Sequence, residues 1–376
     1  MNAKVTRAPG RVNLIGEHTD YTGGLVLPIA IPYATEAATT AAEGVYRFTT
    51  SASHETWEQP VGAAEANPTG EWTDYPAGVL YQLLKSNISV PPFSIHFSGN
   101  VPLSAGLSSS ASIEVATALA LLQHSNSTML PGDIALLCQR AENQYVNSPC
   151  GIMDQYVVTA ATLGHALLIH TRDLQAEQIP MDTGDLANCS IIVANSMVKH
   201  SVATGDYGVR RRELEEGQAI LRERFPQLRD LGDAIIDQLV SCEAAMQPNV
   251  FKRCKHVVTE NARVLAACEA MRKGDAATLG TAMTASHASQ RDDFEDSVEE
   301  IDFLVETALQ QPGCYGARLT GGGFGGCTVN LVATEHVPAF TSALSAAYQQ
   351  RFGIVPEIYP CHAAAGAVAL LSEATA

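Results

Sequence analysis

The sequence predicts a two-domain protein of the α/β class. Its 376 residues are enough to form two hydrophobic cores. Hydrophobic residues make up 46% and charged residues 17% of the chain, which is the balance of an ordinary globular protein. Segments with strand character alternate along the chain with segments rich in Ala and Leu, so both kinds of secondary structure are expected.

The N-terminal part is predicted to begin with strands and tight turns over residues 4–50. Leu25–Ile31 and Val45–Thr50 have the strongest strand character. Residues 54–74 are polar and include Pro60, Pro68 and Gly70, so we expect an exposed loop there. Pro91–Phe97 alternates enough to predict a further strand.

Three helices are predicted in the middle of the chain. Ser110–Leu122 is rich in Ala and Leu and lacks Gly and Pro. Pro131–Tyr145 has a proline at its start and apolar residues at helical spacing. Pro149-Cys150-Gly151 interrupts the chain, and Ile152–Ala161 is expected to continue as a helix.

A domain boundary is predicted between two strands that follow. The strands are His165–His170 and Cys189–Asn195, and Pro180–Asn188 connects them. We therefore expect an N-terminal domain of residues 1–184 and a C-terminal domain of residues 185–376. Besides Cys189–Asn195, the predicted elements of the second domain are three helices and two strands. They are Arg210–Arg224, Asn249–Arg272, Asp275–Ser289, Tyr315–Arg318 and Cys327–Val332.

The charge and the cysteines limit the possible partners. A net charge of −17 argues against nonspecific binding to nucleic acid or to an anionic membrane surface. The nine cysteines are odd in number and form no C-x-x-C pair, as expected in a reducing compartment. Met1–Thr6 has no apolar stretch of a secretory signal, and no apolar run approaches the length of a membrane span. We expect a cytoplasmic protein with no nucleic-acid or membrane partner.

The segment Gly10–Tyr21 concentrates polar side chains near the N-terminus. Arg11, Glu17, His18 and Asp20 lie within ten residues of one another. Carboxylates and an imidazole form hydrogen bonds in fixed directions, as recognition of a hydroxyl-rich molecule requires. The alternative is a solvated loop, since polar side chains are usually exposed and a single histidine is more often structural.

The segment Val101–Ser112 carries a run of serines where a glycine-containing loop meets a predicted helix. Backbone N–H groups at a helix start attract phosphate oxygens, and the hydroxyls of Ser108, Ser109 and Ser110 suit phosphate or Mg²⁺. It is not a Walker A loop, because no Gly-Lys-Ser/Thr follows. The alternative is a serine that only caps the helix.

Further segments carry acidic residues and glycines. Asp154 is expected in the first turn of a helix and Glu142 on the helix before it, where both are also explained as ordinary helical residues. Gly321–Gly326 contains G-x-G-x-x-G, but no βαβ unit with a following acidic residue surrounds it, so a dinucleotide site is not predicted.

Three of these segments resemble the motifs of the GHMP kinases, the family of galacto-, homoserine, mevalonate and phosphomevalonate kinases. Gly10–Tyr21 is similar to the galactokinase signature, Val101–Ser112 to the second motif and Leu319–Cys327 to the third, in family order. The resemblance implies the two-domain GHMP fold. Its N-terminal domain is similar to domain 2 of ribosomal protein S5, its C-terminal domain is ferredoxin-like, and the active site lies between them.

The resemblance also implies the chemistry. It indicates an ATP-dependent sugar 1-kinase that phosphorylates the C1 hydroxyl of D-galactose with Mg²⁺ as cofactor. Asp154 would be the catalytic base and Arg11 its partner, while Ser110 and Glu142 would bind the metal. A carboxylate beside an arginine is a weak base, which a loose phosphoryl-transfer transition state tolerates.

Binding residues are implied in the same way. The sugar contacts would be Glu17, His18, Asp20, Gly151, Asp154 and Tyr207, although the Ser-Glu that usually precedes this tyrosine in the family is Gly205-Asp206 here. The ATP contacts would be Gly106, Leu107, Ser108, Ser109, Ser110, Ala111, Trp72 and Tyr75. Trp72 and Tyr75 suit stacking on adenine, but an ordinary buried aromatic pair explains them nearly as well.

Two alternative functions remain open. The first is another sugar 1-kinase of the family that acts on N-acetylgalactosamine, arabinose or galacturonate; Thr19 fits the galactose pattern. The second is a non-catalytic galactose sensor. Such relatives lose part of the serine run, whereas Ser108–Ala111, Asp154 and Arg11 are all present here. We expect D-galactose and ATP as ligands of a monomeric enzyme.

Overall fold

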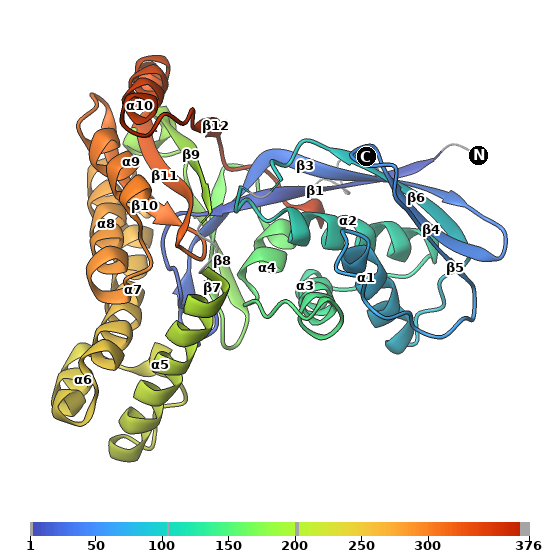
Figure 1. Ribbon diagram of the computed structural model, residues 1–376, viewed down its shortest axis with the longest axis horizontal. Coiled ribbons are helices and arrows are strands. Elements are labelled where there is room, and N and C mark those ends of the chain that lie inside the picture. Colours follow the sequence, from blue (N-terminus) through green and yellow to red (C-terminus); the bar gives the residue numbers. More distant parts are fainter. Residues whose placement is uncertain (1–2, 104, 200–202, 369–376) are drawn as a thin grey trace. The chain divides into compact units, whose positions relative to one another are not determined.

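The computed structural model describes residues 3–103, 105–199 and 203–368, without the side chains of residues 199 and 203–207 (Figure 1). The chain divides into two compact units. The first comprises the chain up to Arg11, Ala30–Leu163 and the chain from Ala363; the second comprises Val12–Ile29 and Gly164–His362. Each unit therefore contains segments that are distant in sequence. The expected division at residue 184 stays a prediction.

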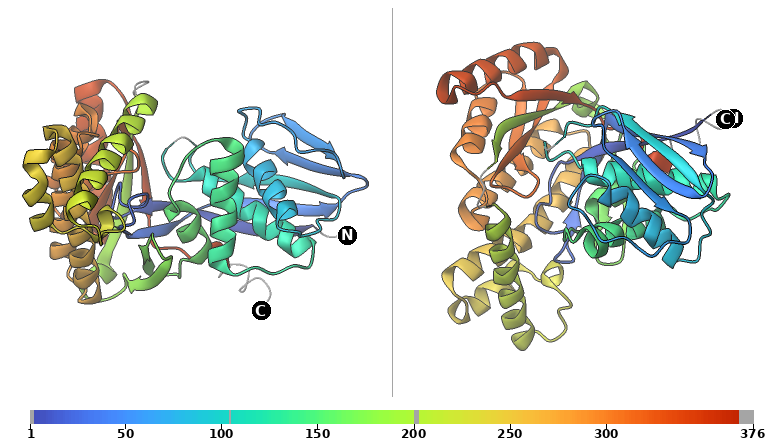
Figure 2. Two further views of the ribbon diagram at one scale, coloured as in Figure 1. Left: turned by 90° about the horizontal axis from the view of Figure 1, so that it is seen from below. Right: turned by 45° about the vertical axis from the view of Figure 1, so that its right-hand side comes forward.

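The first unit is built on a five-stranded sheet with the order β1-β3-β6-β4-β5. The strands are β1 (Lys4–Asn13), β3 (Pro28–Ala41), β4 (Val45–Thr50), β5 (Thr56–Pro60) and β6 (Phe93–Gly99). β4 and β6 are parallel, whereas β3 pairs with β6, and β4 with β5, in antiparallel fashion. Four helices lie on one side of this sheet (Figures 1 and 2). They are α1 (Asp74–Lys85), α2 (Ser109–His124), α3 (Pro131–Arg140) and α4 (Met153–Ala160).

The core of the first unit lies between the sheet and these helices. Phe48, Phe93 and Phe97 project from the strands and pack against one another. Most of α2 is buried, and its many alanines allow close approach to the neighbouring elements. Burial of this apolar surface provides the main driving force for folding of the unit.

The second unit contains a four-stranded antiparallel sheet with the order β10-β11-β9-β12. The strands are β9 (Cys189–Lys199), β10 (Cys314–Thr320), β11 (Gly325–Ala333) and β12 (Glu357–Cys361). Several helices separate β9 from β10, and one helix separates β11 from β12, which is the expected ferredoxin-like pattern. A smaller sheet has the order β2-β7-β8, with β2 (Leu25–Val26), β7 (His165–His170) and β8 (Gln175–Pro180).

The helices of the second unit form two groups. The first group packs on the four-stranded sheet and consists of α8 (Ala276–Ser289), α9 (Glu299–Leu309) and α10 (Val337–Phe352). The second group forms a separate helical cluster (Figure 2) and consists of α5 (Ala203–Arg224), α6 (Ile236–Cys242) and the adjoining part of α7 (Pro248–Arg272). Across the described ranges, none of the helices has both the length and the apolar character that a membrane span needs.

Most expected elements are present, with two corrections. Val45–Thr50 and His165–His170 are confirmed as strands. The loop expected over residues 54–74 is wrong in part, because β5 forms an edge strand there, paired to β4. The helix expected over Pro131–Tyr145 changes type: α3 ends at Arg140, and Ala141–Val146 continues as a π-helix. Short π-helical segments occur frequently at functional sites.

Helix α8 and strand β10 touch backbone to backbone, and this contact generates a stability prediction. A Cβ atom at Gly280 would lie 2.1 Å from the carbonyl oxygen of Tyr315. We expect Gly280→Ala to lower the free energy of unfolding by about 1–3 kcal/mol, because backbone atoms cannot move aside easily. Gly132→Ala is the matched control, since a Cβ there has its nearest neighbour at 3.7 Å. Equal midpoints in urea denaturation would contradict the prediction.

Candidate active site

Arg11 in β1 and Asp154 in the first turn of α4 form a two-pronged ion pair. The Nε and Nη2 groups of Arg11 donate to the two carboxylate oxygens at 2.7 Å each, and Nη1 donates to the carbonyl of Gly106, also at 2.7 Å. Arg11 is buried, whereas 23% of the Asp154 side chain remains exposed. The guanidinium therefore holds the carboxylate in one orientation and leaves it accessible to a ligand.

Ser108 also orients this carboxylate. Its backbone has a φ of 57°, in the left-handed region, and its hydroxyl donates to Asp154 Oδ2 at 2.5 Å. The residue precedes α2, but its side chain makes no capping hydrogen bond, so the interpretation as a plain serine cap is wrong. The loop before it contacts β1 closely, because the amide of Arg11 donates to the carbonyl of Leu107 at 3.1 Å.

A second acidic group lies beside this ion pair. Glu142 is in the π-helical turn, where its carboxylate interacts with the hydroxyl of Ser110. Gln155, which is completely buried, donates to Glu142 Oε2 at 2.6 Å and to Glu114 Oε2 at 3.1 Å. Gln155, which directly follows Asp154 in the sequence, thus bridges two buried carboxylates with one side-chain amide.

The electrostatics of this group favour a cation. Burial, together with the negative charge of Asp154, raises the pKa of Glu142 to about 7. Burial also raises the pKa of Glu114 well above its usual range, and its Oε1 has no hydrogen-bond partner. A cation near Glu142 would offset the cost of keeping this carboxylate charged.

The donor set fits Mg²⁺ rather than a metal held by protein alone. Among the described residues, no three or more His, Cys, Asp or Glu side chains are placed to hold a metal ion together. Mg²⁺ is usually bound by one or two carboxylates, waters and the phosphates of its substrate. The carboxylate of Glu142 and the hydroxyl of Ser110 are consistent with that mode.

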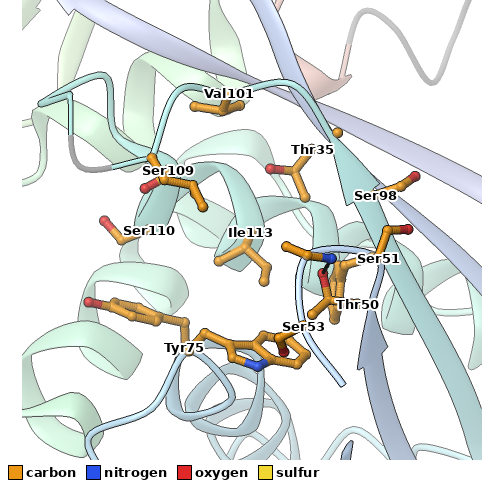
Figure 3. A pocket seen from close by; sticks show the side chains of 15 residues that line it. Thr35, Thr50, Ser51, Ser53, Tyr75, Ser98, Val101, Ser109, Ser110 and Ile113 are labelled. Carbon is orange, nitrogen blue, oxygen red and sulfur yellow. Dashed lines mark hydrogen bonds between the residues drawn. The ribbon is translucent and has the colours of Figure 1, made fainter. Parts of the chain in front are cut away.

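A pocket of about 540 Å³ opens beside the start of α2. Trp72 and Tyr75 contribute aromatic surface and Ile113 contributes apolar surface, as Figure 3 shows for Tyr75 and Ile113. The side chains of Ser109 and Ser110 stand at one end of the hollow (Figure 3). Hydroxyl groups also line the opposite end, on Thr50, Ser51 and Ser53 (Figure 3). A flat apolar slot that ends at a helix start suits a heterocycle with attached phosphates.

The remaining predicted ATP contacts differ in exposure. Leu107 and Ala111 have completely buried side chains, so only their backbone groups can contact a ligand. Gly106 is exposed, and a Cβ there would meet nothing within 4 Å. Trp72 packs edge-on against Phe97 and also lines the pocket, so it is both a core residue and a pocket residue.

Glu17, in the second unit, is held by the segment that leads into the third motif. Its Oε1 atom accepts from the amide of Gly321 at 2.9 Å, from the hydroxyl of Thr320 at 3.1 Å and from Arg318 at 3.3 Å. Glu17 is buried. Any contact of this carboxylate with a sugar would therefore have to come from Oε2.

His18 is engaged at both ring nitrogens. Nδ1 lies 2.9 Å from the hydroxyl of Tyr21 and Nε2 lies 2.8 Å from Asp296 Oδ2, while the ring stacks on Phe294 at 3.9 Å. Its φ of 62° is in the left-handed region, so this contact network holds a strained turn. His18 is therefore well placed to shape the loop, and its direct contact with sugar stays a prediction.

The structure gives less detail on the other predicted sugar contacts. Asp20 is half-buried in the turn after His18, and Gly151 is half-buried in the loop before α4. Tyr207 lies in α5, but its side chain is outside the described part of the structure.

The third motif forms a loop that is open on one side. Among the described residues, Cβ atoms at Gly321, Gly322 and Gly326 would meet nothing within 4 Å, whereas one at Gly323 would lie 2.6 Å from the carbonyl oxygen of Asp296. One glycine is thus required for packing. The three open glycines leave space for the close approach of a ligand.

Several residues around these sites were not predicted from sequence. Gln155 could have been suspected from its position next to Asp154. Asp296 offered no signal, because its contact with His18 follows from the π-helical turn Gln290–Phe294 and the left-handed Glu295. Such geometry depends on packing and cannot be recognised from local spacing.

Comparison with known families supports this arrangement. Residues 74–165 match the model for the GHMP kinases N terminal domain, and residues 267–350 match that for the GHMP kinases C terminal. Residues 2–41 match the galactokinase galactose-binding signature. The fold and its motifs thus define the chain as a GHMP kinase, as the sequence predicts.

Full-length relatives define the branch of the family. The chain is 38% identical to a galactokinase of Chloroflexus aurantiacus over 96% of its own length and 92% of the relative's. It is 41% identical to a galactokinase of Pasteurella multocida, with 96% and 93% covered. The crystal structure of Lactococcus lactis galactokinase complexed with galactose superposes with a TM-score of 0.91 at 30% identity, with 96% and 94% covered. The chain belongs to the galactokinase family, whose members are ATP-dependent sugar kinases.

The position of Glu142 predicts an unusual dependence of stability on pH. With a pKa of about 7 in place of the ordinary 4.5, this carboxyl binds more protons in the folded than in the unfolded chain. The free energy of unfolding therefore decreases as the pH rises from about 4.5 to about 7, and above that range the loss is complete. The total decrease is on the order of 3 kcal/mol. We expect Glu142→Gln to raise the melting temperature at about pH 8, and to reduce its change between about pH 5 and pH 8.

The measurement is thermal unfolding without metal or nucleotide. Glu71→Gln, at an exposed glutamate, is the matched control and should leave the pH profile unchanged. A Glu142→Gln protein that melts below the unmodified chain near neutral pH would show that burial of this charge is not costly.

Proposed function

We propose that this protein transfers the γ-phosphoryl group of ATP to the C1 hydroxyl of D-galactose, giving ADP and galactose 1-phosphate. The observation that carries the proposal is the carboxylate of Asp154, which Arg11 and Ser108 orient beside the serine-rich start of α2. The galactokinase signature and the galactose complex of the Lactococcus relative support galactose as the acceptor.

Asp154 acts on the acceptor hydroxyl. Its two oxygens together offer about four lone-pair positions, and Arg11 and Ser108 occupy three of them. The remaining position on Oδ1 accepts the proton of the C1 hydroxyl as the oxygen–phosphorus bond forms. Because a loose transition state removes this proton late, a carboxylate paired with arginine is basic enough. Arg11 also stabilises charge that develops during transfer.

ATP binds in the pocket beside α2. Trp72 and Tyr75 contact the adenine, while the backbone N–H groups at the start of α2, including that of Ser108, and the hydroxyls of Ser109 and Ser110 contact the phosphates. Ser110 and Glu142 would hold Mg²⁺, which neutralises phosphate charge when bound. These local groups explain how a chain with a net charge of −17 binds a polyanion.

The sugar contacts follow from the family pattern. Glu17, through Oε2, and Asp20 accept hydrogen bonds from sugar hydroxyls, and His18 shapes their loop. Gly151 and Tyr207 complete the set. We also propose that the enzyme is monomeric, as the family pattern implies, and cytoplasmic, which the nine scattered cysteines and the need for ATP support.

A sugar panel tests the proposed reaction. Mg²⁺-dependent release of ADP is measured with galactose, N-acetylgalactosamine, arabinose, galacturonate, glucose and no sugar, and the product is identified. Turnover with galactose alone, phosphorylated at C1, is the expected result. Turnover with another sugar would overturn the acceptor but keep the kinase, whereas galactose binding without turnover would support a sensor.

Asp154→Asn tests the assigned base. We expect kcat to fall by at least about a hundredfold, because an amide cannot accept the proton, while galactose binding measured by calorimetry persists. Asp292→Asn is the matched control, since Asp292 is an exposed aspartate that pairs with the neighbouring Arg291. Retention of most of the rate in Asp154→Asn would remove this residue from the catalytic step.

A further inference from the structure

Helix α7 carries a row of polar side chains that the proposed reaction does not use. His256 and Glu260 lie four residues apart on one face of the helix, and Asn261 follows Glu260 directly. His256 and Glu260 are completely buried. Buried polar groups are costly unless they are hydrogen bonded, so their partners indicate their purpose.

Two of these side chains bind the ends of the loop over residues 16–25, which we call the sugar loop because it contains Glu17, His18 and Asp20. The amide of Gly16 donates to Glu260 Oε1 at 2.9 Å. The amide of Leu25 donates to Asn261 Oδ1, also at 2.9 Å. The entry and the exit of the loop are therefore bound to the same turn of one helix.

The third side chain binds inside the loop. His256 Nε2 lies 3.2 Å from the carbonyl oxygen of Glu17. Because a carbonyl only accepts, Nε2 carries the proton and donates. Burial lowers the pKa of His256 to about 4, so near neutral pH the ring is uncharged and keeps this donor. The backbone of Glu17 is thus held independently of its carboxylate.

Glu260 is an ionised acceptor inside the protein. Burial alone would raise its pKa, but the charge of Arg263, whose Nε donates to Oε2 at 2.6 Å, helps to hold the pKa at about 2. The hydroxyl of Ser286 donates to Oε1 at 2.6 Å beside the Gly16 amide. A charge-assisted hydrogen bond in a dry environment is about twice as strong as a neutral one.

The sugar loop also packs tightly on α7. A Cβ at Gly24 would lie 2.5 Å from Asn261 Oδ1, and one at Gly16 would lie 3.1 Å from Val264 Cγ2. The glycines at the two ends of the loop therefore let its backbone reach the helix side chains. Small displacements of α7 would be passed on directly to the loop.

We propose that Glu260, His256 and Asn261 are positioning residues for the sugar. They fix the backbone of the sugar loop, and thereby the directions in which Glu17 and Asp20 present their carboxylates to the galactose hydroxyls. This inference rests on the proposed function, because those hydroxyls are the ligand. It assigns to α7 a part in setting the affinity for sugar without touching it.

Glu260→Gln tests the proposal. The amide keeps one oxygen, but its NH₂ group then faces a donor of either Arg263 or Gly16. We expect KM for galactose to rise about tenfold, as loss of a buried charge-assisted hydrogen bond implies, while KM for ATP stays within about twofold. Glu269→Gln is the matched control on the same helix, because Glu269 is exposed and pairs with Arg272.

A change only in melting temperature or in the active fraction, with KM for galactose unaltered, would overturn the proposal in favour of a purely structural role. Wild-type protein is first assayed on the sugar panel. If it phosphorylates a different sugar, the proposed acceptor fails, and the variants are then measured with that sugar, so the two failures are distinguished.

His256→Leu and His256→Gln provide a second test that does not depend on Glu260. Leucine removes the donor to the Glu17 carbonyl and should raise KM for galactose about tenfold. Glutamine can place an N–H group at a similar reach and should restore most of the affinity. Equal KM values for the two variants, measured on folded protein, would contradict a positioning role.

Discussion

A carboxylate that leaves water must receive hydrogen-bond donors or a positive charge, and the functional parts of this protein differ in how that requirement is met. Asp154, Glu17 and Glu260 each accept several hydrogen bonds from arginine, hydroxyl or backbone amide groups. Glu142 and Glu114 share one amide group of Gln155, and Glu142 also accepts from the hydroxyl of Ser110 and the weakly donating thiol of Cys150. Among the described residues, neither of these two carboxylates has an arginine, lysine or histidine partner. Asp154, Glu17 and Glu260 are therefore held rigidly as hydrogen-bond acceptors. Glu142 and Glu114, by contrast, would be stabilised in their charged form by a cation.

This difference between the carboxylates explains how the proposed site can hold the phosphates of ATP. The protein as a whole is strongly acidic, yet it belongs to a family that binds ATP. No broad basic surface is needed if the anion is held by the start of α2 and by a cation beside Glu142. The instability that Glu142 causes in the absence of a cation is then the same property that favours metal and nucleotide together.

Specific hydrogen bonds also hold the sugar loop and the start of the third motif. The backbone of Glu17 is held by His256, and its carboxylate is held by Thr320 and Gly321. A displacement of Thr320 or Gly321 would break hydrogen bonds to Oε1 of Glu17. Within the second unit, the sugar-binding motif and the glycine-rich loop therefore form one hydrogen-bonded assembly, and helix α7 lies behind it.

The sequence by itself determined the family, the order of the motifs and most regular elements. Apolar periodicity is local, so segments such as Val45–Thr50 and His165–His170 were predicted correctly. The resemblance of three motifs to those of the GHMP kinases suggested the chemistry, whereas Asp154 by itself is equally explained as an ordinary helical residue. By contrast, the edge strand β5 was missed, because its pairing with β4 depends on a neighbour rather than on its own polar sequence.

Only the tertiary structure decided which polar groups meet. Ser108 directs its hydroxyl to Asp154 because its backbone is left-handed, and α3 continues as a π-helix that carries Glu142. Neither conformation follows from residue spacing. The contact of Glu260 with Gly16 joins positions 244 residues apart, so no local pattern could reveal it. Hydrogen bonds between distant segments depend on packing of the whole unit, and they determine which of the polar side chains can contact a ligand and which serve as support.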